Sequence, residues 1–530
     1  MDREVIAIIP ARGGSKGIPR KNVRIFNGMP LIEHATRIAM SAKKVSKVIV
    51  TSDDPEILEI ATRSGAIPFK REPELASDVA TLDVVIHDVV ETLQASDAII
   101  VTIQATCPLI KSSTIDRAVE AVQFNPKSTC FTVVENRHLT WVKKGEEFRE
   151  NYLERVNRQD LEPFFTETGG VVACLASKVV NFKTRFVAPY QPICVTEIES
   201  IDIDTSADWA KAQIVSRQKR IAVFVTGNET IGLGHLYRQL ALYDHFAMHE
   251  ICFFCPEADS FIIKFLSSKF IAVKGFNYKS VNDILSDFRP DVIINDLLDG
   301  WVDLIEPQRA TDAKIVIFET EVHEQNRDYD VVNALYPSKY FNDRIGPDWF
   351  ILRPEFMSIN PKIVTNEVTE ILVTFGGVDP ADQALRLYQI LSGCEFKNVH
   401  RTIVLGKAYN GGLIDVESNE DFEIVHDTSQ ISKYMNRADI AITSKGRTIY
   451  ELAKCGVPTL SISQNDREVR HSFGGVYFED LGLYSDLSNE ELKSSLLKLC
   501  SDVSKRRSMQ LNNVAISFRG IENIIKLIEE

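Results

Sequence analysis

Short apolar segments alternate with amphipathic segments of helical period along nearly the whole chain, and this alternation restricts the fold more than any other feature. Five apolar segments in the first part of the chain are expected strands: Val5–Ile9, Lys47–Thr51, Ala66–Phe69, Ala98–Ile103 and Thr129–Val133. Strands that alternate with helices form βαβ units and a mostly parallel sheet. The sequence therefore predicts an α/β fold in which the loops after the strands share one edge of the sheet.

The alternation restarts twice, with new strands expected at Ile221–Val225 and Glu370–Phe375. A chain of 530 residues has room for three or four domains or lobes. A polar stretch, SRQKR, precedes the first restart and marks the expected boundary. The predicted division is a first domain, a short linker and two smaller lobes, at residues 1–216, 217–220, 221–360 and 361–530.

Charge and hydropathy exclude several classes of protein. The net charge of −14 disfavours bulk binding of nucleic acid, because a polyanion is repelled. No apolar run approaches the roughly 18–20 residues of a membrane span, and the first apolar run is shorter than the about 7–15 residues of a secretory signal. The nine cysteines are scattered, and the only close pair, Cys252 and Cys255, lies in an apolar run. We therefore expect a cytoplasmic protein with buried thiols and no zinc site.

The loop after the first strand, IPARGGSKGIPRKN over residues 9–22, combines glycines with positive charge. Glycines let backbone N–H groups approach a ligand closely, and cations strengthen hydrogen bonds to phosphate. The loop matches neither G-x-x-x-x-G-K-[ST] nor G-x-G-x-x-G. Its composition predicts a triphosphate-binding loop built on Gly13, Gly14 and Gly17 and on the cations Arg12, Lys16, Arg20 and Lys21.

Two aspartates, Asp202 and Asp204, end the strand pattern of the first domain. In a strand, residues two apart point to the same face of the sheet. Two carboxylates on one face suit Mg²⁺, which accepts one or two carboxylates together with phosphate oxygens. We therefore predict a Mg²⁺ site there that serves the triphosphate.

Five motifs in the first domain carry a family resemblance: IPARGGSKGIPRKN, REPELASD at 71–78, QATCPL at 104–109, RQD at 158–160 and DIDT at 202–205. In this order they resemble the CMP-sialic acid synthetases, or acylneuraminate cytidylyltransferases, over residues 1–215. The resemblance implies a Rossmann-like nucleotidyltransferase domain of GT-A-like type. It also implies transfer of CMP from CTP to a nine-carbon α-keto acid, a nonulosonic acid, with release of pyrophosphate.

The resemblance also assigns residues. It places Lys21 and Asp204 in catalysis, Asp202 and Asp204 at Mg²⁺, and Gln104 and Gln159 at the sugar. It implies CTP binding by Arg12, Gly13, Gly14, Ser15, Lys16, Lys21, Asn22 and Arg71. It implies a homodimer in which the region around residues 138–165 completes the partner's sugar pocket.

The sequence departs from the family pattern at Cys107 and Ile110, where the family usually has polar residues. The identity of the sugar acid is therefore left open, whereas the nucleotide is not. The keto-deoxy-octulosonate cytidylyltransferases resemble the start of the chain but continue with a different pattern.

In the second half, glycine-bearing turns again stand between a strand and a helix. These turns are GLGHLYR at 232–238, TFGGVDP at 374–380 and SKGRTIYEL at 444–452. Such turns leave N–H groups open at a helix N-terminus, where diphosphates bind well. His235 in the first turn is a candidate general base or water-positioning group, and Glu451 a candidate acceptor for ribose hydroxyls.

These turns resemble the UDP-sugar hydrolase of pseudaminic acid biosynthesis and the spore-coat polysaccharide group, across residues 221–530. The resemblance implies a two-lobed GT-B-like fold and removal of UDP by attack of water on the anomeric carbon. His235 matches the motif histidine, and Asp296 is a possible cleft residue. The implied nucleotide-sugar contacts are Gly234, Arg238, Gly376, Gly377, Thr448 and Glu451.

The second half also departs from that family. Leu297 and Leu298 follow Asp296, Phe-Glu-Thr-Glu at 318–321 replaces a paired Asp-Asp, and Lys445 and Arg447 stand where small residues are expected. The prediction is a bifunctional enzyme of nonulosonic acid biosynthesis that uses CTP, a nonulosonic acid and a UDP-sugar. The alternative is a cytidylyltransferase whose second half is glycosyltransferase-like or a non-catalytic nucleotide-sugar-binding module.

Overall fold

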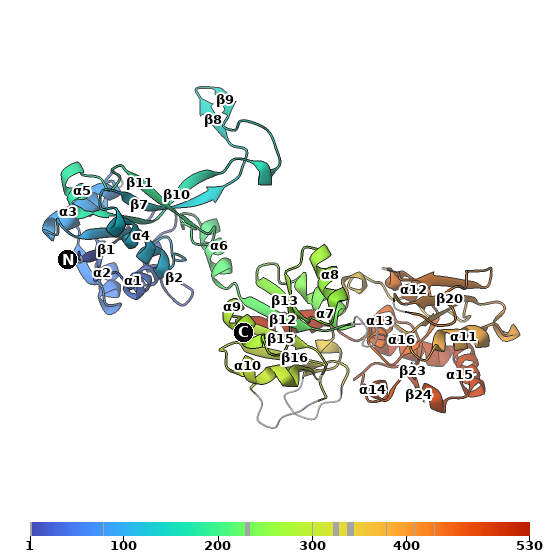
Figure 1. Ribbon diagram of the computed structural model, residues 1–530. Helices are drawn as coiled ribbons and strands as arrows, with labels where there is room; N and C mark the ends of the chain where they lie inside the picture. The colour runs from blue at the N-terminus through green and yellow to red at the C-terminus, as the bar shows by residue number, and fades with distance from the viewer. Residues whose placement is uncertain are drawn as a thin grey trace. The chain divides into compact units, whose positions relative to one another are not determined.

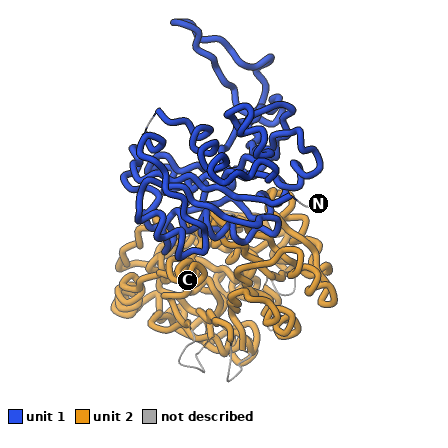
Figure 2. The backbone as a smooth tube through the Cα atoms, turned by 90° about the vertical axis from the view of Figure 1, so that its left-hand side faces the viewer, with its two compact units in different colours: residues 1–218 blue, residues 219–530 orange. Residues whose placement is uncertain are grey.

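The computed structural model describes the whole chain except residues 1–2, 78, 228–233, 299, 322–327, 337–343, 378, 408 and 429. The chain divides into two compact units, Met1–Gln218 and Lys219–Glu530, which Figure 2 colours separately. Within the described residues, no helix is both long and apolar enough to cross a lipid bilayer.

A seven-stranded sheet forms the centre of unit 1, in the order β11-β7-β10-β6-β1-β4-β5. Its strands are β1 (Val5–Pro10), β4 (Lys47–Ser52), β5 (Ile67–Lys70), β6 (Ile99–Ile103), β7 (Thr129–Asn136), β10 (Phe164–Leu175) and β11 (Tyr190–Val195). Within the sheet, β1 pairs in parallel with β4 and β6, whereas β10 runs antiparallel to both of its neighbours. The predicted mostly parallel α/β sheet is therefore confirmed, with one reversed strand.

Helices cover both faces of this sheet. They are α1 (Leu31–Ser41), α2 (Pro55–Arg63), α3 (Leu82–Thr92), α4 (Ser112–Phe124) and α5 (Ala176–Phe182), while α6 (Ser206–Ser216) packs in a separate apolar cluster with Phe26 and Leu31. Alternate residues of β1 point to opposite faces. Ala7 and Ile9 pack in the core beneath α1, α2 and α4, and Ile6 and Ile8 pack beneath α3 and α5. Two-sided burial explains why β1 is apolar throughout.

Unit 1 also carries an arm that lies away from its sheet (Figure 1). Its strands β8 (Trp141–Lys144) and β9 (Glu147–Glu150) pair only with each other. The arm exposes apolar side chains, among them half of Trp141 and nearly two thirds of Phe148. A two-stranded hairpin with apolar residues in water is marginally stable on its own.

The first lobe of unit 2 contains a seven-stranded, all-parallel sheet in the order β14-β13-β12-β15-β16-β17-β18. The strands are β12 (Arg220–Val225), β13 (Glu250–Pro256), β14 (Val273–Phe276), β15 (Val292–Asp296), β16 (Lys314–Phe318), β17 (Asp330–Asn333) and β18 (Arg344–Ile345). Its helices are α7 (Gly234–Tyr243), α8 (Ser260–Ser268), α9 (Val281–Phe288) and α10 (Ile305–Arg309).

The last helix of the chain, α17 (Gly520–Glu529), also belongs to this first lobe. Ile524 and Ile528 are fully buried in the same core as α7 and α8. The predicted second lobe, residues 361–530, therefore ends earlier than we expected. The apolar residues of α17 recur at the spacing of a helix, so its sequence indicates a helix. The sequence does not indicate which of the two lobes this helix packs against.

The second lobe is built on a six-stranded parallel sheet in the order β21-β20-β19-β22-β23-β24. Its strands are β19 (Glu370–Thr374), β20 (His400–Leu405), β21 (Phe422–His426), β22 (Ile440–Ser444), β23 (Thr459–Ser463) and β24 (Glu479–Leu483). Its helices are α11 (Gln383–Leu391), α12 (Ile431–Arg437), α13 (Thr448–Cys455), α14 (Asp466–Val469), α15 (Asn489–Ser501) and α16 (Val503–Val514).

The two lobes of unit 2 share an apolar core. Leu335 and Phe350 from the first lobe pack with Leu372 and Tyr450 from the second. The Tyr450 hydroxyl donates a hydrogen bond of 2.8 Å to the Ala334 carbonyl. Two parallel α/β sheets joined in one unit give the two-lobed, GT-B-like architecture that we predicted.

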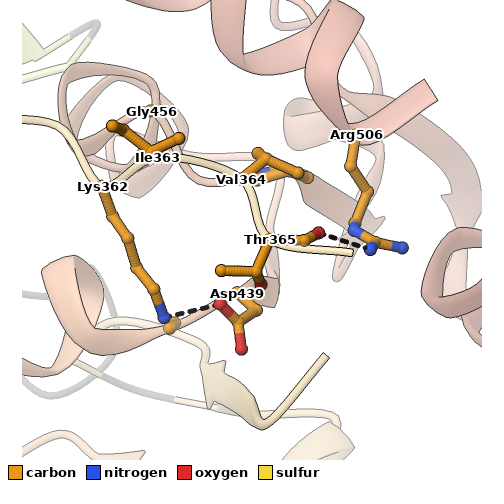
Figure 3. A pocket seen from close by; sticks show the side chains of 9 residues that line it. Lys362, Ile363, Val364, Thr365, Asp439, Gly456 and Arg506 are labelled. Carbon is orange, nitrogen blue, oxygen red and sulfur yellow. Dashed lines mark hydrogen bonds and ion pairs between the residues drawn. The ribbon is translucent and has the colours of Figure 1, made fainter. Parts of the chain in front are cut away.

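The segment that connects the lobes is held to the second lobe by charged side chains (Figure 3). Lys362 Nζ lies 2.5 Å from Asp439 Oδ1. The guanidinium of Arg506, which is 1 % exposed, donates to the carbonyls of Thr365 and Asn366 at 3.1 and 2.8 Å. The residues enclose a cavity of about 10 Å³, which is about the size of one water molecule.

We predict that Arg506→Met lowers the free energy of unfolding of unit 2 by about 3 kcal/mol, since it leaves several buried carbonyls without a donor. Arg507→Met is the matched control, because Arg507 is exposed and its guanidinium bonds Asn366 Oδ1. Thermal unfolding followed by circular dichroism measures both. Equal midpoints for the two variants would contradict the prediction.

Candidate functional site

A cavity of about 390 Å³ opens at the edge of the unit 1 sheet, where β1 and β6 end. Nine of the predicted site residues line it: Arg12, Ser15, Lys16, Gly17, Lys21, Asn22, Arg71, Gln104 and Asp204. Gly13, Gly14, Asp202 and Gln159 are not among its lining residues. The loop after β1, the start of the loop after β6 and the segment before α6 thus meet around one polar space.

The glycine-rich loop is fixed against residues 203–204, far away in the sequence. A Cβ on Gly17 would lie 2.2 Å from the carbonyl oxygen of Asp204, so only glycine fits. Lys21 Nζ donates to the Ile203 carbonyl at 2.5 Å and lies 3.0 Å from Asp204 Oδ1. At the other end of the loop, the N–H of Gly13 donates to Asp53 Oδ1 at 3.1 Å. The cations are therefore positioned by backbone packing before any ligand binds.

Asn22 and Arg71 each leave a buried polar atom without a partner in the described structure. Asn22 Nδ2 donates to the Arg12 carbonyl at 2.9 Å, while its Oδ1 is buried and unbonded. Arg71 Nη2 donates to the Thr51 carbonyl at 2.7 Å, while its Nε is buried and unbonded. Burial lowers the pKa of Arg71. An unpaired acceptor and an unpaired donor beside one cavity suit a heterocycle that offers both kinds of group.

Asp202 and Asp204 do not lie in a strand, which corrects our prediction. Residues 201–204 are irregular, and the N–H of Ile203 bonds the Thr106 carbonyl at 2.9 Å. The Asp204 side chain is 74 % exposed, whereas Asp202 Oδ1 is buried without a partner and desolvation raises the pKa of Asp202. No cluster of three or more metal-binding side chains is found in the described part of the chain.

Gln104 lies at the cavity and Gln159 does not. Gln104 packs against Gly169, whose φ is +69° and whose Cβ would lie 2.4 Å from Gln104 Nε2. The Gly169-Gly170 pair marks the register shift in β10, a signal that our sequence analysis missed. Gln159 lies in the exposed 3-10 turn Arg158–Asp160, which follows the arm. Cys107 is buried, and this burial raises the pKa of its thiol.

In unit 2, a buried charge network lies where β15 and β16 end and α7 begins. Asp296, the last residue of β15, accepts from Arg238 Nε at 2.8 Å and from Gln239 Nε2 at 2.7 Å. Arg238 Nη1 also donates to Glu319 Oε1 at 3.3 Å, and Glu319 Oε2 accepts the Leu335 N–H at 3.2 Å. The first part of the predicted turn, residues 228–233, lies outside the described residues.

We predicted that Arg238 contacts the nucleotide sugar, but its side chain is already paired within the protein. Its side chain is 3 % exposed and is bonded by Asp296 on one side and Glu319 on the other. Burial alone would raise the pKa of Asp296, but Arg238 and His235 outweigh it and hold that pKa well below its usual range. Arg238 therefore positions Asp296.

His235 is held by the same carboxylate. Its Nδ1 lies 2.6 Å from Asp296 Oδ1 and 3.1 Å from Arg238 Nη2. An ionised carboxylate only accepts hydrogen bonds, so the shorter contact assigns the proton to Nδ1. Burial lowers the pKa of His235 despite the attraction of Asp296, so the ring is neutral near pH 7. Nε2 is then the basic nitrogen, as a general base requires.

Of the nucleotide-sugar contacts that we predicted in the second lobe, the glycines and Thr448 lie in turns or at a helix start, whereas Glu451 is paired within the protein. Gly376 has a φ of +78° and, with Gly377, ends the turn after β19. Thr448 begins α13. Glu451 is buried, and Arg353 donates to both of its oxygens at 2.8 and 2.9 Å. This bidentate pair was not predicted, because Arg353 lies far from the α13 motif in the sequence.

We predict that Arg238→Met lowers the free energy of unfolding of unit 2 by about 3–5 kcal/mol at pH 7, since it leaves two buried carboxylates uncompensated. Without Arg238, desolvation raises the pKa of Asp296 and Glu319, so the folded variant binds more protons than the unfolded chain. The loss therefore shrinks as the pH falls from 7 to 5. Denaturant unfolding at several pH values measures it.

The control for this measurement is Arg470→Met, which breaks an exposed ion pair with Glu321. An exposed pair contributes about 0–1 kcal/mol, so this variant should unfold nearly as the unaltered chain does. The prediction is wrong if Arg238→Met lowers the free energy of unfolding no more than Arg470→Met does, or if the loss does not depend on pH.

Comparison with known proteins bears on both units. A family model described as "Cytidylyltransferase" matches residues 6–227. The CMP-N,N'-diacetyllegionaminic acid synthase of Legionella pneumophila is 32 % identical, over 39 % of this chain and 93 % of its own length. A pseudaminic acid cytidylyltransferase of Campylobacter jejuni is 30 % identical, over 41 % of this chain and 99 % of its own length.

One relative is similar along both units. It is a Helicobacter pylori protein named "Pseudaminic acid cytidylyltransferase and UDP-2,4-diacetamido-2,4,6-trideoxy-beta-L-altropyranose hydrolase". It is 24 % identical over 518 residues, which cover 92 % of this chain and 93 % of the relative. The similarity therefore extends across the boundary between the units.

Proposed function

The chain belongs to the cytidylyltransferase family, and on this premise we propose that unit 1 transfers CMP from CTP to a nonulosonic acid and releases pyrophosphate. We further propose that unit 2 hydrolyses a UDP-sugar precursor of that acid. A sugar acid of the pseudaminic type is favoured, because the relative with both activities in its name aligns along both units. All nine cysteines are free thiols, which fits the reducing cytoplasm.

The first activity is supported by the cavity of unit 1, in which four cations, Arg12, Lys16, Lys21 and Arg71, line a space of about 390 Å³. Arg12, Lys16 and Lys21 would bind the phosphates of CTP by charge-assisted hydrogen bonds. The anomeric hydroxyl of the sugar loses its proton to water as its oxygen attacks the α-phosphorus, and the bond from that phosphorus to the oxygen that bridges the α- and β-phosphates breaks. The electron pair leaves with pyrophosphate, whose charge the cations stabilise.

The residues at the end of unit 1 fit a Mg²⁺ ion. Asp204 offers an exposed carboxylate at the cavity, and Asp202 has a buried oxygen with no partner in the described structure. Mg²⁺ takes one or two carboxylates and completes its shell with phosphate oxygens and water, so a third protein ligand is unnecessary. When bound, Mg²⁺ would neutralise charge on the triphosphate.

The base and sugar subsites follow from the same cavity. Asn22 Oδ1 would accept a hydrogen bond from the cytosine amino group, and Arg71 would donate to a cytosine or ribose oxygen; both residues hold buried atoms without partners. Gln104 lines the cavity and is assigned to the sugar acid. Gln159 would reach the sugar only in a homodimer, in which the apolar arm with Trp141 packs on a second copy.

The hydrolase activity is supported by the hydrogen bond between His235 Nδ1 and Asp296 Oδ1, which are 2.6 Å apart. Nε2 of the neutral ring would take a proton from water as its oxygen attacks the anomeric carbon. The bond from that carbon to the UDP oxygen then breaks, and UDP leaves. The alternative is a non-catalytic or glycosyltransferase-like unit, in which no water attack occurs.

We expect pyrophosphate release from CTP and Mg²⁺ with at least one acid from a panel of neuraminic, legionaminic and pseudaminic acids. Lys21→Ala and Asp204→Ala should each lower the rate about 100-fold, because each removes a charged group at the triphosphate. Lys43→Ala is the control, because Lys43 is exposed and not among the cavity residues. Unchanged rates in both cavity variants, or no release with any acid, would reject the assignment.

We expect His235→Gln to lower UDP release from the UDP-sugar about 100-fold or more and to leave pyrophosphate release by unit 1 unchanged. Since the pKa of His235 is lowered, the rate of the unaltered enzyme should stay constant below pH 6.5 before it declines. UDP release at different pH values tests this. If the unaltered protein releases no UDP, the non-catalytic or glycosyltransferase-like alternative stands.

A further inference from the structure

The saturation of Arg238 removes it from the nucleotide-sugar contacts that we predicted for unit 2. Arg238 is the only cation among the nucleotide-sugar contacts that we predicted, and its guanidinium is bonded by Asp296 and Glu319. A nucleoside diphosphate carries negative charge on both phosphates, and guanidinium groups bind such oxygens strongly. A guanidinium with an unpaired donor beside the glycine-bearing turns would therefore add to the binding by their backbone N–H groups.

Arg447 has an unpaired donor. Its guanidinium lies over the Phe350 ring, 4.5 Å from the ring centre, and Nη2 donates to the Ile351 carbonyl at 2.9 Å. Nη1 is buried and has no hydrogen-bond partner in the described structure. A buried donor without a partner is destabilising, so a site that holds one in place indicates a missing acceptor.

Arg447 also lies beside the charge network of His235. The start of α7 is close to it, since a Cβ on Gly234 would lie 3.7 Å from Arg447 Cδ. Burial and the nearby Arg238 lower the pKa of Arg447, whereas Glu319 and Asp296 lie near enough to oppose this lowering. These contacts place the unpaired donor next to the residue that we assign as the base.

The other cation of the same turn is not available. Lys445 Nζ donates to the Val469 carbonyl at 3.0 Å and lies 2.8 Å from Asp480 Oδ2. Its ammonium group is therefore neutralised within the second lobe. Of the two basic residues that distinguish this turn, Arg447 alone retains an unpaired nitrogen in the described structure.

We propose that Arg447 binds the diphosphate of the nucleotide sugar through Nη1 and that it is the cationic contact in place of Arg238. The inference rests on the proposed function of unit 2. An arginine at this position donates to a phosphate oxygen in the bound state and stabilises the negative charge that UDP gains as it leaves. Arg238 then acts as a positioning residue and Arg447 as the ligand contact.

Isothermal titration of the full chain with UDP and with uridine tests this proposal, with CTP present at saturation to fill the cavity of unit 1. Arg447→Met should weaken UDP binding about 10- to 100-fold, the loss expected for one charge-assisted hydrogen bond, and leave uridine binding unchanged. Arg447→Lys keeps the charge but not the planar donor group, so its affinity should be intermediate.

Arg470→Met is the control for loss of one positive charge and should bind UDP as the unaltered chain does. Thermal unfolding of all variants checks that Arg447→Met is folded; if it is not, Arg447→Lys carries the test. Equal UDP affinity in the folded Arg447 variants and the unaltered chain overturns the inference alone. Equal weakening of uridine and UDP also overturns it, because the contact is then not to phosphate. If the unaltered chain binds no UDP, the proposed function of unit 2 fails as well.

Discussion

Parallel pairing of strands determines where chemistry is possible in this protein. Parallel neighbours all end at the same edge of a sheet, so the loops that follow them converge. Arg12 follows β1, and Gln104 follows β6 at the same edge of unit 1. In unit 2, Asp296 ends β15 and Glu319 follows β16 in the same way. The charged residues are assembled by strand order, although they are far apart in the sequence.

The two units differ in where their charged side chains lie. In unit 1, cations line an open cavity, and the backbone contact between Gly17 and Asp204 fixes the loop that carries them. In unit 2, Arg238 and Asp296 are buried and neutralise each other within the protein. Cations that line a cavity suit a ligand that brings several negative charges. The buried ion pair of unit 2 orients one side chain, His235, and determines which of its ring nitrogens carries the proton.

The sequence predicted the parts of the structure that depend on local patterns. The three strand–helix series, the glycine-rich loop at the cavity of unit 1 and the position of His235 at the start of α7 follow from short stretches of residues. Three features could not be predicted because they depend on distant contacts. Glu319 saturates Arg238 only in the folded sheet, Arg353 reaches Glu451 from another element, and residues 201–204 are held by Thr106 and Lys21 rather than by strand pairing.

The return of α17 to the first lobe of unit 2 has a consequence for biosynthesis. The core beneath α7 and α8 includes Ile524 and Ile528, which the ribosome adds only after the whole second lobe has been made. Domains generally fold as units while the chain emerges, so unit 1 can complete its sheet early. The first lobe of unit 2 stays unfinished until the second lobe has been translated. The chain therefore exposes an apolar surface during synthesis that only its own last helix covers.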